Sequence, residues 1–380
     1  MQLELTEEQT MIRDAARAMA EGELLPRATK QDRQEKLDPE VFVALGELGL
    51  WGLTVPAEYG GAGLGNLELS LVLEEVNRAC ASTGVTLSVH NSLVCGPIKK
   101  FGTEAQKKQW LPKLAAGEIY GAYCLTEPNS GSDAAALQTT ARAEGDDFVL
   151  NGTKTWVTNG GIAGLYLVYA RTDPKVSKAK GISAFLVPRE TPGLSIGKHE
   201  KKTGIRASST TEILLQNARV PRTNMLGELN KGFTVAMDTL DGGRIGIASQ
   251  AVGIARACLE ASVKYAKERE QFGQPIANYQ AIQWKIADMA TRIDASRMLT
   301  WKAAWLADRK EKCTQAASEA KLFASQTANF AADECLQIHG GAGYTDHFHV
   351  ERLFRDARIT EIYEGATDVQ RIVIARSVLA

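Results

Sequence analysis

The chain has 380 residues, and 44 Lys and Arg residues against 45 Asp and Glu residues give a formal net charge of −1. This balance argues against bulk electrostatic binding of nucleic acid or of an anionic membrane. With 44% hydrophobic and 23% charged residues, the composition is that of a globular protein of two or three domains. No stretch approaches the ~20 apolar residues that cross a membrane, so we expect no membrane insertion.

The cysteines and the N-terminus bear on the compartment. The six cysteines form no CxxC pair, and none has a zinc-like spacing to a histidine pair. We therefore expect reduced, mostly buried thiols and no metal site. The N-terminus is acidic and lacks a secretory pattern. We expect a cytoplasmic bacterial protein, or a mitochondrial matrix protein if the sequence is a trimmed eukaryotic form.

Residues 1–120 are predicted to form a helical domain. Thr6 is placed to cap the first helix, and a long helix is expected from Leu67 to Cys80. The glycine-rich residues 56–65 have some likeness to a phosphate loop, but Asn66 stands where the third glycine of GxGxxG would be. We therefore interpret this segment as a turn between helices.

Residues 121–229 change to β character. Six or so short strands are predicted here, in a compact antiparallel barrel or sandwich. Asn151-Gly152 splits two of the runs and predicts a hairpin turn. Trp156 and Thr158 lie two residues apart on a predicted strand, so they are expected to share one face. The pair is either ordinary packing or a surface for a flat heteroaromatic ligand.

The helical period returns at residues 230–380. Helices are predicted over residues 231–268, 279–309 and 314–338, which make most of a four-helix bundle. A last helix is expected to begin near Thr367, with Thr367 and Gln370 forming a Thr-x-x-Gln capping box. The order of helices, strands and helices does not match a doubly wound nucleotide fold, and it predicts an α+β chain.

Three short motifs have ordinary alternatives. Residues 193–197 match GxSxG, but no helix start follows, which favours a chance match over a nucleophile elbow. His347 and His349 have no third metal ligand nearby in the sequence. Residues 337–344 end a helix with three glycines, which suit either a C-cap or a phosphate-binding nest.

Two further segments are candidates for chemistry. Residues 123–133, YCLTEPNSGSD, are rich in backbone and hydroxyl donors, which suit a phosphate or a carbonyl-rich ring as well as a domain junction. Glu364 lies near the apolar residues Ile359, Ile362 and Tyr363. Such surroundings raise the pKa of a carboxyl, which can then act as a base near neutral pH. Taken alone, Glu364 is better explained as a solvated loop residue, and only the full set of motifs favours a base.

The motifs taken together resemble one family. In chain order they are VPAEYGGAG, FGTEAQKKQWLPKLAAGE, YCLTEPNSGSD, NGTKTWVTNG, KTGIRASSTTEI, DGGRIGIASQAVGIA, EREQFGQPI, QIHGGAGY and RDARITEIYEGATDVQR. From end to end the sequence is similar to the acyl-CoA dehydrogenases, and within them to the short-chain (butyryl-CoA) branch. The resemblance implies an N-terminal helical domain (1–120), a middle β domain (121–229) and a C-terminal four-helix bundle (230–380).

The resemblance also implies FAD and assigns residues to it. Flavin contacts fall on Tyr123, Leu125, Thr126, Trp156 and Thr158. Contacts to the FAD of a neighbouring subunit fall on Arg269, Phe272, Gln280, Gln337, Gly340 and Gly341, and the last helix adds Thr367 and Asp368. The acyl-CoA contacts fall on Ser132, Asp241, Arg244, Gln250, Thr360, Tyr363 and Gly365.

Glu364 matches the catalytic base of the family. It would take the α-hydrogen of the thioester as a proton while the β-hydrogen leaves as hydride to the flavin, giving a trans-2-enoyl-CoA. Some relatives carry the base at the position of Gly243, which cannot serve here. Ala366, Asp368 and His349 depart from the common residues Thr, Glu or Gln, and Pro, and the first two departures put those cofactor contacts in question.

Substrate, acceptor and assembly follow from the same resemblance. Gln250 and Thr360 are expected to close the far end of the acyl pocket and to hydrogen-bond each other, which favours butyryl-CoA over longer chains. The 2-methyl-branched and isobutyryl thioesters are the alternative substrates. Electron-transferring flavoprotein is the expected acceptor, and an oxidase that uses oxygen is the alternative. A homotetramer, built as a dimer of dimers, is expected.

Overall fold

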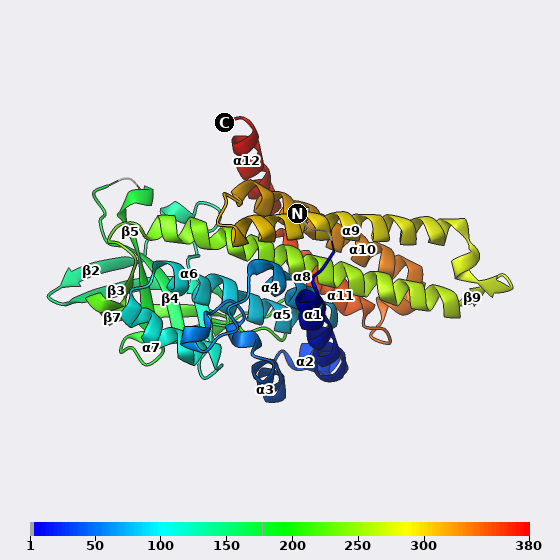
Figure 1. Cartoon of the computed structure of the whole chain (residues 1–380), viewed down its shortest axis with the longest axis horizontal. Coiled ribbons are helices and arrows are strands. Elements are labelled where there is room, and N and C mark those ends of the chain that lie inside the picture. Colours follow the sequence, from blue (N-terminus) through cyan, green and yellow to red (C-terminus); the bar gives the residue numbers. More distant parts are fainter. Residues whose placement is uncertain (1–3, 177) are drawn as a thin grey trace.

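The computed structural model describes residues 4–176 and 178–380, and residues 1–3 and 177 lie outside the described part. Helices, strands and helices follow one another along the chain, which confirms the predicted α+β class (Figure 1). The N-terminal helices are α1 (Glu7–Met19), α2 (Leu25–Gln34), α3 (Pro39–Glu47), α4 (Asn66–Ala79), α5 (Ala81–Ser88), α6 (Gly96–Phe101) and α7 (Glu104–Ala115). The π-helical turns Ala20–Leu24 and Val89–Cys95 join α1 to α2 and α5 to α6.

The predicted cap by Thr6 at the start of α1 is confirmed, and the structure shows it as part of a capping box. The Thr6 hydroxyl accepts from the Gln9 amide at 3.2 Å, and the Gln9 side chain accepts from the Thr6 amide at 3.1 Å. The glycine-rich residues 56–65 form the turn between helices that the missing third glycine predicts.

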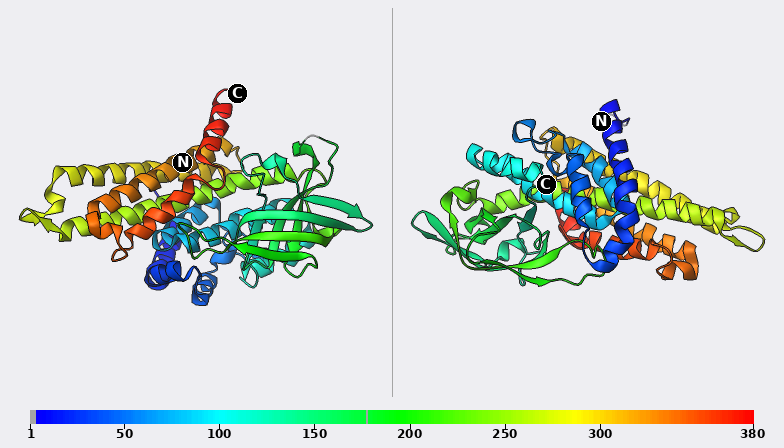
Figure 2. Two further views of the ribbon diagram at one scale, coloured as in Figure 1. Left: turned by 180° about the vertical axis from the view of Figure 1, so that it is seen from behind. Right: turned by 90° about the horizontal axis from the view of Figure 1, so that it is seen from below.

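The strands of residues 121–226 lie in one sheet at one end of the molecule (Figures 1 and 2). They are β1 (Gly121–Cys124), β2 (Thr140–Glu144), β3 (Asp147–Thr158), β4 (Leu165–Arg171), β5 (Ile182–Pro188), β6 (Leu194–His199), β7 (Thr210–Pro221) and β8 (Met225–Leu226). The order is β6-β7-β3-β2-β4-β5-β8, with β1 beside β4. The sheet is mixed, because β1 and β2 both run parallel to β4.

The predicted hairpin turn at Asn151-Gly152 is wrong. Strand β3 runs straight through these residues, and the turn lies instead between Glu144 and Asp147. The pairing of β3 with β7 shifts register between Leu150 and Gly152, so the dipeptide makes a bulge. A side chain at Gly152 would collide with the backbone of Thr139, which explains why a glycine stands in mid-strand.

The C-terminal helices form the other end of the molecule. The long helices α8 (Gly232–Glu268), α9 (Gln280–Asp308) and α10 (Thr314–His339) fall within two residues of the predicted spans. They share a core with α5 and α11 (Val350–Arg358), and α11 was not predicted from the sequence. The small strands β9 (Glu270–Gln271) and β10 (Gln274–Pro275) form a hairpin between α8 and α9. The last helix, α12 (Thr367–Val378), projects from the body (Figure 1).

The capping box predicted at the start of α12 is wrong. Ala366 occupies the cap position, and no side chain caps the helix. The Thr367 hydroxyl donates to the Glu361 carbonyl at 3.2 Å. The Gln370 side chain donates to the carbonyls of Glu364 and Gly365. The turn before α12 offers carbonyl acceptors that engage both side chains, so neither is left to cap the helix.

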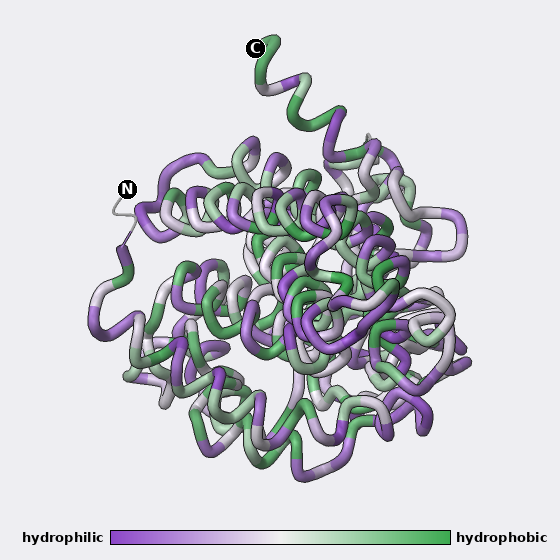
Figure 3. The backbone as a smooth tube through the Cα atoms, turned by 90° about the vertical axis from the view of Figure 1, so that its right-hand side faces the viewer, coloured by the Kyte–Doolittle hydropathy of each residue, from purple (hydrophilic) through white to green (hydrophobic). Residues whose placement is uncertain are grey.

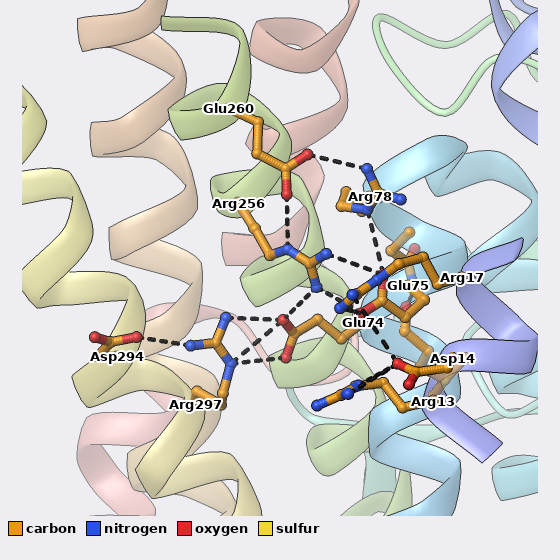
Figure 4. Close-up of polar contacts among 12 residues, drawn as sticks. Arg13, Asp14, Arg17, Glu74, Glu75, Arg78, Arg256, Glu260, Asp294 and Arg297 are labelled. Atoms are coloured by element: carbon orange, nitrogen blue, oxygen red, sulfur yellow. Dashed lines mark hydrogen bonds and ion pairs between the residues drawn. The ribbon is translucent and has the colours of Figure 1, made fainter. Parts of the chain in front are cut away.

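A network of ion pairs joins the N-terminal helices to the long helices (Figure 4). Glu75 on α4 is 1% exposed and accepts from Arg17 of α1 at 2.9 Å and Arg256 of α8 at 2.7 Å. Glu74 beside it pairs with Arg297 of α9 at 2.8 Å. Burial favours the neutral form of Glu75, but the two arginines outweigh it and lower its pKa to about 2. The network therefore fixes α4 against α1, α8 and α9.

In the described part of the chain, no helix combines the length and apolar composition needed to span a membrane.

Candidate active site

Glu364 lies in the turn between α11 and α12, and its backbone is left-handed. Its φ is +50°, and that of Gly365 is +93°. For a residue with a side chain this conformation costs about 1–3 kcal/mol and persists only where the surroundings hold it. The Gln370 side chain holds it from α12, donating to the Gly365 carbonyl at 2.8 Å.

The Glu364 carboxylate is placed as a base. Its Oε2 atom is buried and has no hydrogen-bond partner among the described residues. Burial raises the pKa of Glu364 to about 7, and the positive charges of Lys321 and Arg244 oppose this rise. A carboxylate with this pKa and an unused oxygen can accept a proton near neutral pH.

Gly243 on α8 faces this carboxylate. A Cβ built on Gly243 would lie 3.1 Å from Glu364 Cδ and closer still to Oε2, and 2.8 Å from Leu93 Cδ2. A side chain at position 243 would therefore occupy the space that the Glu364 carboxylate takes. Positions 243 and 364, the two that the resemblance offers for the base, therefore face each other in the structure.

Arg244 and Asp241 lie one turn apart on α8 at the same site. Arg244 is 5% exposed and donates through Nη1 to Asp241 Oδ1 at 2.8 Å. The Thr314 hydroxyl donates to the other Asp241 oxygen at 2.6 Å. Arg244 Nε is buried with no partner in the described residues, so a donor remains for a ligand oxygen.

The predicted hydrogen bond between Gln250 and Thr360 is wrong. Both residues are fully buried. The Thr360 hydroxyl donates back to the Ala357 carbonyl at 2.7 Å, a local bond typical of threonine in a helical turn. The Gln250 side chain donates to the Ala81 carbonyl at 3.1 Å and accepts from the Tyr363 hydroxyl. Gln250 is therefore held rigid, but by Tyr363 and α5.

A second group of candidates gathers where β1 and β3 end. The Thr155 amide donates to the Thr126 carbonyl at 2.9 Å, which ties the segment after β1 to β3. Trp156 has a φ of +58° at a register shift and is 62% exposed. Val157 is buried, whereas Trp156 and Thr158 are not, so both point away from the sheet core as their spacing predicts.

Other residues of this group connect the sheet to the base. Leu125 is buried. The Tyr123 ring packs 5.2 Å from that of Tyr169, and the nearby charge of Glu364 adds to the burial that raises the pKa of Tyr123. Tyr123 therefore places the β1 end close to the carboxylate. Ser132 lies exposed in the loop that follows β1.

The sequence interpretation missed two buried lysines at this site. Lys154 of β3 donates to Glu127 at 2.7 Å and to the Leu125 carbonyl at 3.2 Å, which fixes the segment after β1. Lys321 of α10 donates to the Gly365 carbonyl at 2.8 Å. A signal existed for Lys321, because it lies within a helix face of alanines, where an exposed lysine would not be expected.

The residues matched to a neighbour's FAD lie elsewhere. Arg269, Phe272, Gln280, Gln337, Gly340 and Gly341 are all exposed, and Phe272 is 96% exposed. His339 stacks on Tyr265 at 4.3 Å, which brings the ends of α8 and α10 together. This end and the sheet lie at opposite ends of the molecule (Figure 1). Within one chain, the structure does not bring these residues to Trp156.

The remaining candidate residues lie at the start of α12, at the start of β6 and just before α11. Thr367 is half-buried, and Asp368 is exposed and pairs with Arg371 at 2.8 Å. Residues 193–197 fall on the start of β6 with no helix after them, as expected for a chance GxSxG match. His347 and His349 belong to no cluster of metal-ligating side chains among the described residues.

Comparison with known proteins identifies the family. The acyl-CoA dehydrogenase N-terminal, middle and C-terminal domain models match residues 6–118, 122–218 and 230–379. The mitochondrial short-chain specific acyl-CoA dehydrogenase of Mus musculus is 51% identical over 377 residues, covering 99% of this chain and 91% of that protein.

Two solved structures cover 100% of this chain and are themselves covered in full. Butyryl-CoA dehydrogenase from Megasphaera elsdenii is 43% identical with a TM-score of 0.98. A chain from a structural study of the electron transferring flavoprotein of Acidaminococcus fermentans is 46% identical with a TM-score of 0.98.

The chain belongs to the acyl-CoA dehydrogenase family. It is accordingly an FAD-dependent oxidoreductase that acts on acyl-CoA thioesters. The residues present fit the flavin. Trp156 exposes its aromatic side chain near the end of β3, the adjacent Thr155 is bonded through its backbone to Thr126, and the charge of Glu364 acts on Tyr123 of β1. A flat ring with polar edges matches such a surface.

Proposed function

We propose that this chain dehydrogenates short-chain acyl-CoA thioesters to trans-2-enoyl-CoA, with Glu364 as the base. One observation carries the assignment: a carboxylate with a buried, unpartnered oxygen and a pKa of about 7 faces the bare Gly243 surface of α8. FAD, when bound, supplies the acceptor for the β-hydrogen as a hydride. Glu364 takes the α-hydrogen as a proton, and the electron pair of that C–H bond forms the new double bond.

The other residues bind and orient the thioester. Arg244 keeps a buried donor free for a ligand oxygen, and Asp241 holds its guanidinium in place. The left-handed turn at Glu364 and Gly365 exposes backbone that can approach the thioester carbonyl. Hydrogen bonds to that oxygen stabilise the charge that develops as the weakly acidic α-proton leaves.

The base is tested by Glu364→Gln. The variant is expected to retain FAD and to bind acyl-CoA, but anaerobic butyryl-CoA is expected not to bleach its flavin absorbance. Glu144→Gln is the control, because Glu144 lies at the β2–β3 turn, away from Glu364, and pairs with Arg219. Rapid bleaching in Glu364→Gln would overturn the assignment.

Chain length is set, we propose, by Gln250. The fully buried side chain is braced by Tyr363 and Ala81, so it can serve as a firm end to an acyl pocket. Each methylene admitted or excluded is worth about 1–3 kcal/mol, which separates butyryl from octanoyl chains. Branched four-carbon thioesters need a similar depth and are the alternative substrates. Values of kcat/KM for chains of four to twelve carbons test this, and an optimum at eight or more would contradict it.

Electron-transferring flavoprotein is the proposed acceptor. Support comes from the similarity to the chain in the structural study of the Acidaminococcus fermentans electron transferring flavoprotein. Reoxidation of the substrate-reduced enzyme should be fast with purified electron-transferring flavoprotein and slow with oxygen. Peroxide production at the turnover rate in air would favour the oxidase alternative.

The proposed assembly is a homotetramer, built as a dimer of dimers. The six residues that the resemblance matches to a neighbour's FAD lie around the β9–β10 hairpin and the end of α10, exposed and far from the sheet, and in the proposed assembly a second copy brings them to the flavin site. Projecting α12 also carries exposed Ile372 and Val378, with Leu379 after its end. Figure 3 shows hydrophobic stretches along the projecting C-terminal segment. A monomeric mass for the FAD-loaded protein by light scattering would contradict the proposed assembly.

The cytoplasmic or matrix location stays a prediction.

A further inference from the structure

Lys321 is a buried lysine that the proposed reaction does not yet use. It lies on α10 with its side chain fully buried, although lysine is almost never fully buried unless it is paired. Ala317, Ala320 and Ala324 around it are also buried, and their small side chains leave room for the lysine. The hydrogen bond described for its ammonium runs to the Gly365 carbonyl at 2.8 Å.

That carbonyl belongs to the strained turn that carries Glu364. Gly365 O accepts from Lys321 on α10 and from Gln370 on α12, both at 2.8 Å. The left-handed backbone of Glu364 is therefore held from two helices that come from different parts of the chain. Because the Glu364 side chain makes no hydrogen bond through Oε2, its direction depends on this backbone turn.

Lys321 and Glu364 also act on each other through their charges. Glu364, Glu361 and Arg244 are the charged groups that act on Lys321. Burial lowers the pKa of Lys321 to about 8, against the opposing effect of the two glutamates, so the ammonium is charged at neutral pH. Lys321 is in turn the first of the two cations, with Arg244, that lower the pKa of Glu364 against its burial. Tyr123 and Tyr363 are the phenols on which the Glu364 charge acts.

We propose that Lys321 is a positioning residue for the base. Its ammonium holds the Gly365 carbonyl and so keeps the turn that directs Glu364 toward Gly243, and its charge favours the carboxylate form of Glu364. This inference rests on the proposed role of Glu364.

Three variants separate the two effects. Lys321→Gln keeps a hydrogen-bond donor and removes the charge, Lys321→Arg keeps both, and Lys321→Met removes both. Lys302→Met is the control, because Lys302 on α9 is 52% exposed and lies outside the site. The rate of flavin bleaching by anaerobic butyryl-CoA is measured in a single turnover from pH 5.5 to 9.5.

The expected result is a shift in the pH profile. Removing a positive charge raises the pKa of Glu364, so Lys321→Gln should need a higher pH to reach its plateau. A rise of about one pKa unit lowers the ionised fraction at pH 7 from about a half to about a tenth, a rate loss of about fivefold. The profiles should converge above pH 9, where wild-type Lys321 has lost its charge. Lys321→Met should also have a lower plateau, and Lys321→Arg should restore the wild-type midpoint.

A second measurement does not depend on activity. Thermal unfolding of the holoenzyme is compared for wild type, Lys321→Gln, Glu364→Gln and the double variant. The two substitutions should be non-additive at pH 7.5 and additive at pH 5, where Glu364 is protonated. Bleaching that persists in Glu364→Gln would overturn the proposed function. The thermal-unfolding comparison would still measure whether Lys321 and Glu364 interact. Wild-type pH midpoints in Lys321→Gln and Lys321→Met, with additivity at both pH values, would overturn the inference.

Discussion

Replacing Gly243 by alanine tests how the Glu364 carboxylate is directed without changing the carboxylate itself. Glu364 keeps its carboxylate in this variant, and no residue that the resemblance matches to FAD is changed. The added methyl group enters the space between α8 and the Glu364 turn. The perturbation is therefore steric, and it acts on the one oxygen that we propose accepts the proton.

The expected loss of rate follows from the room around a Cβ at position 243. The new Cβ would lie 3.1 Å from Glu364 Cδ and 2.8 Å from Leu93 Cδ2, closer than real Cβ atoms tolerate at the leucine. Both neighbours are ends of flexible side chains, so they give way and the fold survives. A carboxylate displaced by about 1 Å costs about a hundredfold in rate. Alanine is favoured over glycine within a helix by up to about 1 kcal/mol, which offsets the cost of the displacement to stability.

Gly242 supplies the matched control for this variant. It is the preceding residue on the same helix, and a Cβ there meets nothing within 4 Å. Flavin content, thermal midpoint and single-turnover bleaching by butyryl-CoA are measured for both variants. We expect both proteins to hold FAD and only Gly243→Ala to bleach slowly. Equal wild-type rates in the two variants would refute the placement of the carboxylate against position 243.

Three further predictions follow from the site and the network. With the pKa of Glu364 raised to about 7 by burial, wild-type bleaching should fall about tenfold per unit below pH 7 and level off above it, and a flat profile from pH 5.5 to 8 would contradict this. Glu75→Gln removes a buried carboxylate that pairs with Arg17, Arg78 and Arg256, and it should lower the free energy of unfolding by about 3 kcal/mol in urea titrations, much more than Glu260→Gln, whose carboxylate is 47% exposed. Gln250→Ala should move the kcat/KM optimum to longer acyl chains, and an unchanged optimum would exclude Gln250 as the pocket end.

The sequence by itself determined the elements that depend on local patterns. The spans of α8, α9 and α10 follow from apolar side chains spaced three and four residues apart, and the start of α1 follows from Thr6. These signals are local, because each depends on residues within one or two helical turns. The local rule failed at Asn151-Gly152, where pairing with β7 made a bulge of a dipeptide that usually makes a turn.

Only the tertiary structure decided which distant residues meet. Glu364 and Gly243 are far apart in the chain, and their contact depends on how the turn before α12 packs on α8. Gln250 has Tyr363 as its partner and not Thr360, because Thr360 satisfies its hydroxyl within its own turn. Lys321 could be buried because α10 presents alanines around it and the Gly365 backbone carbonyl, from another segment, accepts a hydrogen bond from its ammonium. A buried polar group requires a partner, and the sequence around it does not state where in the chain that partner lies.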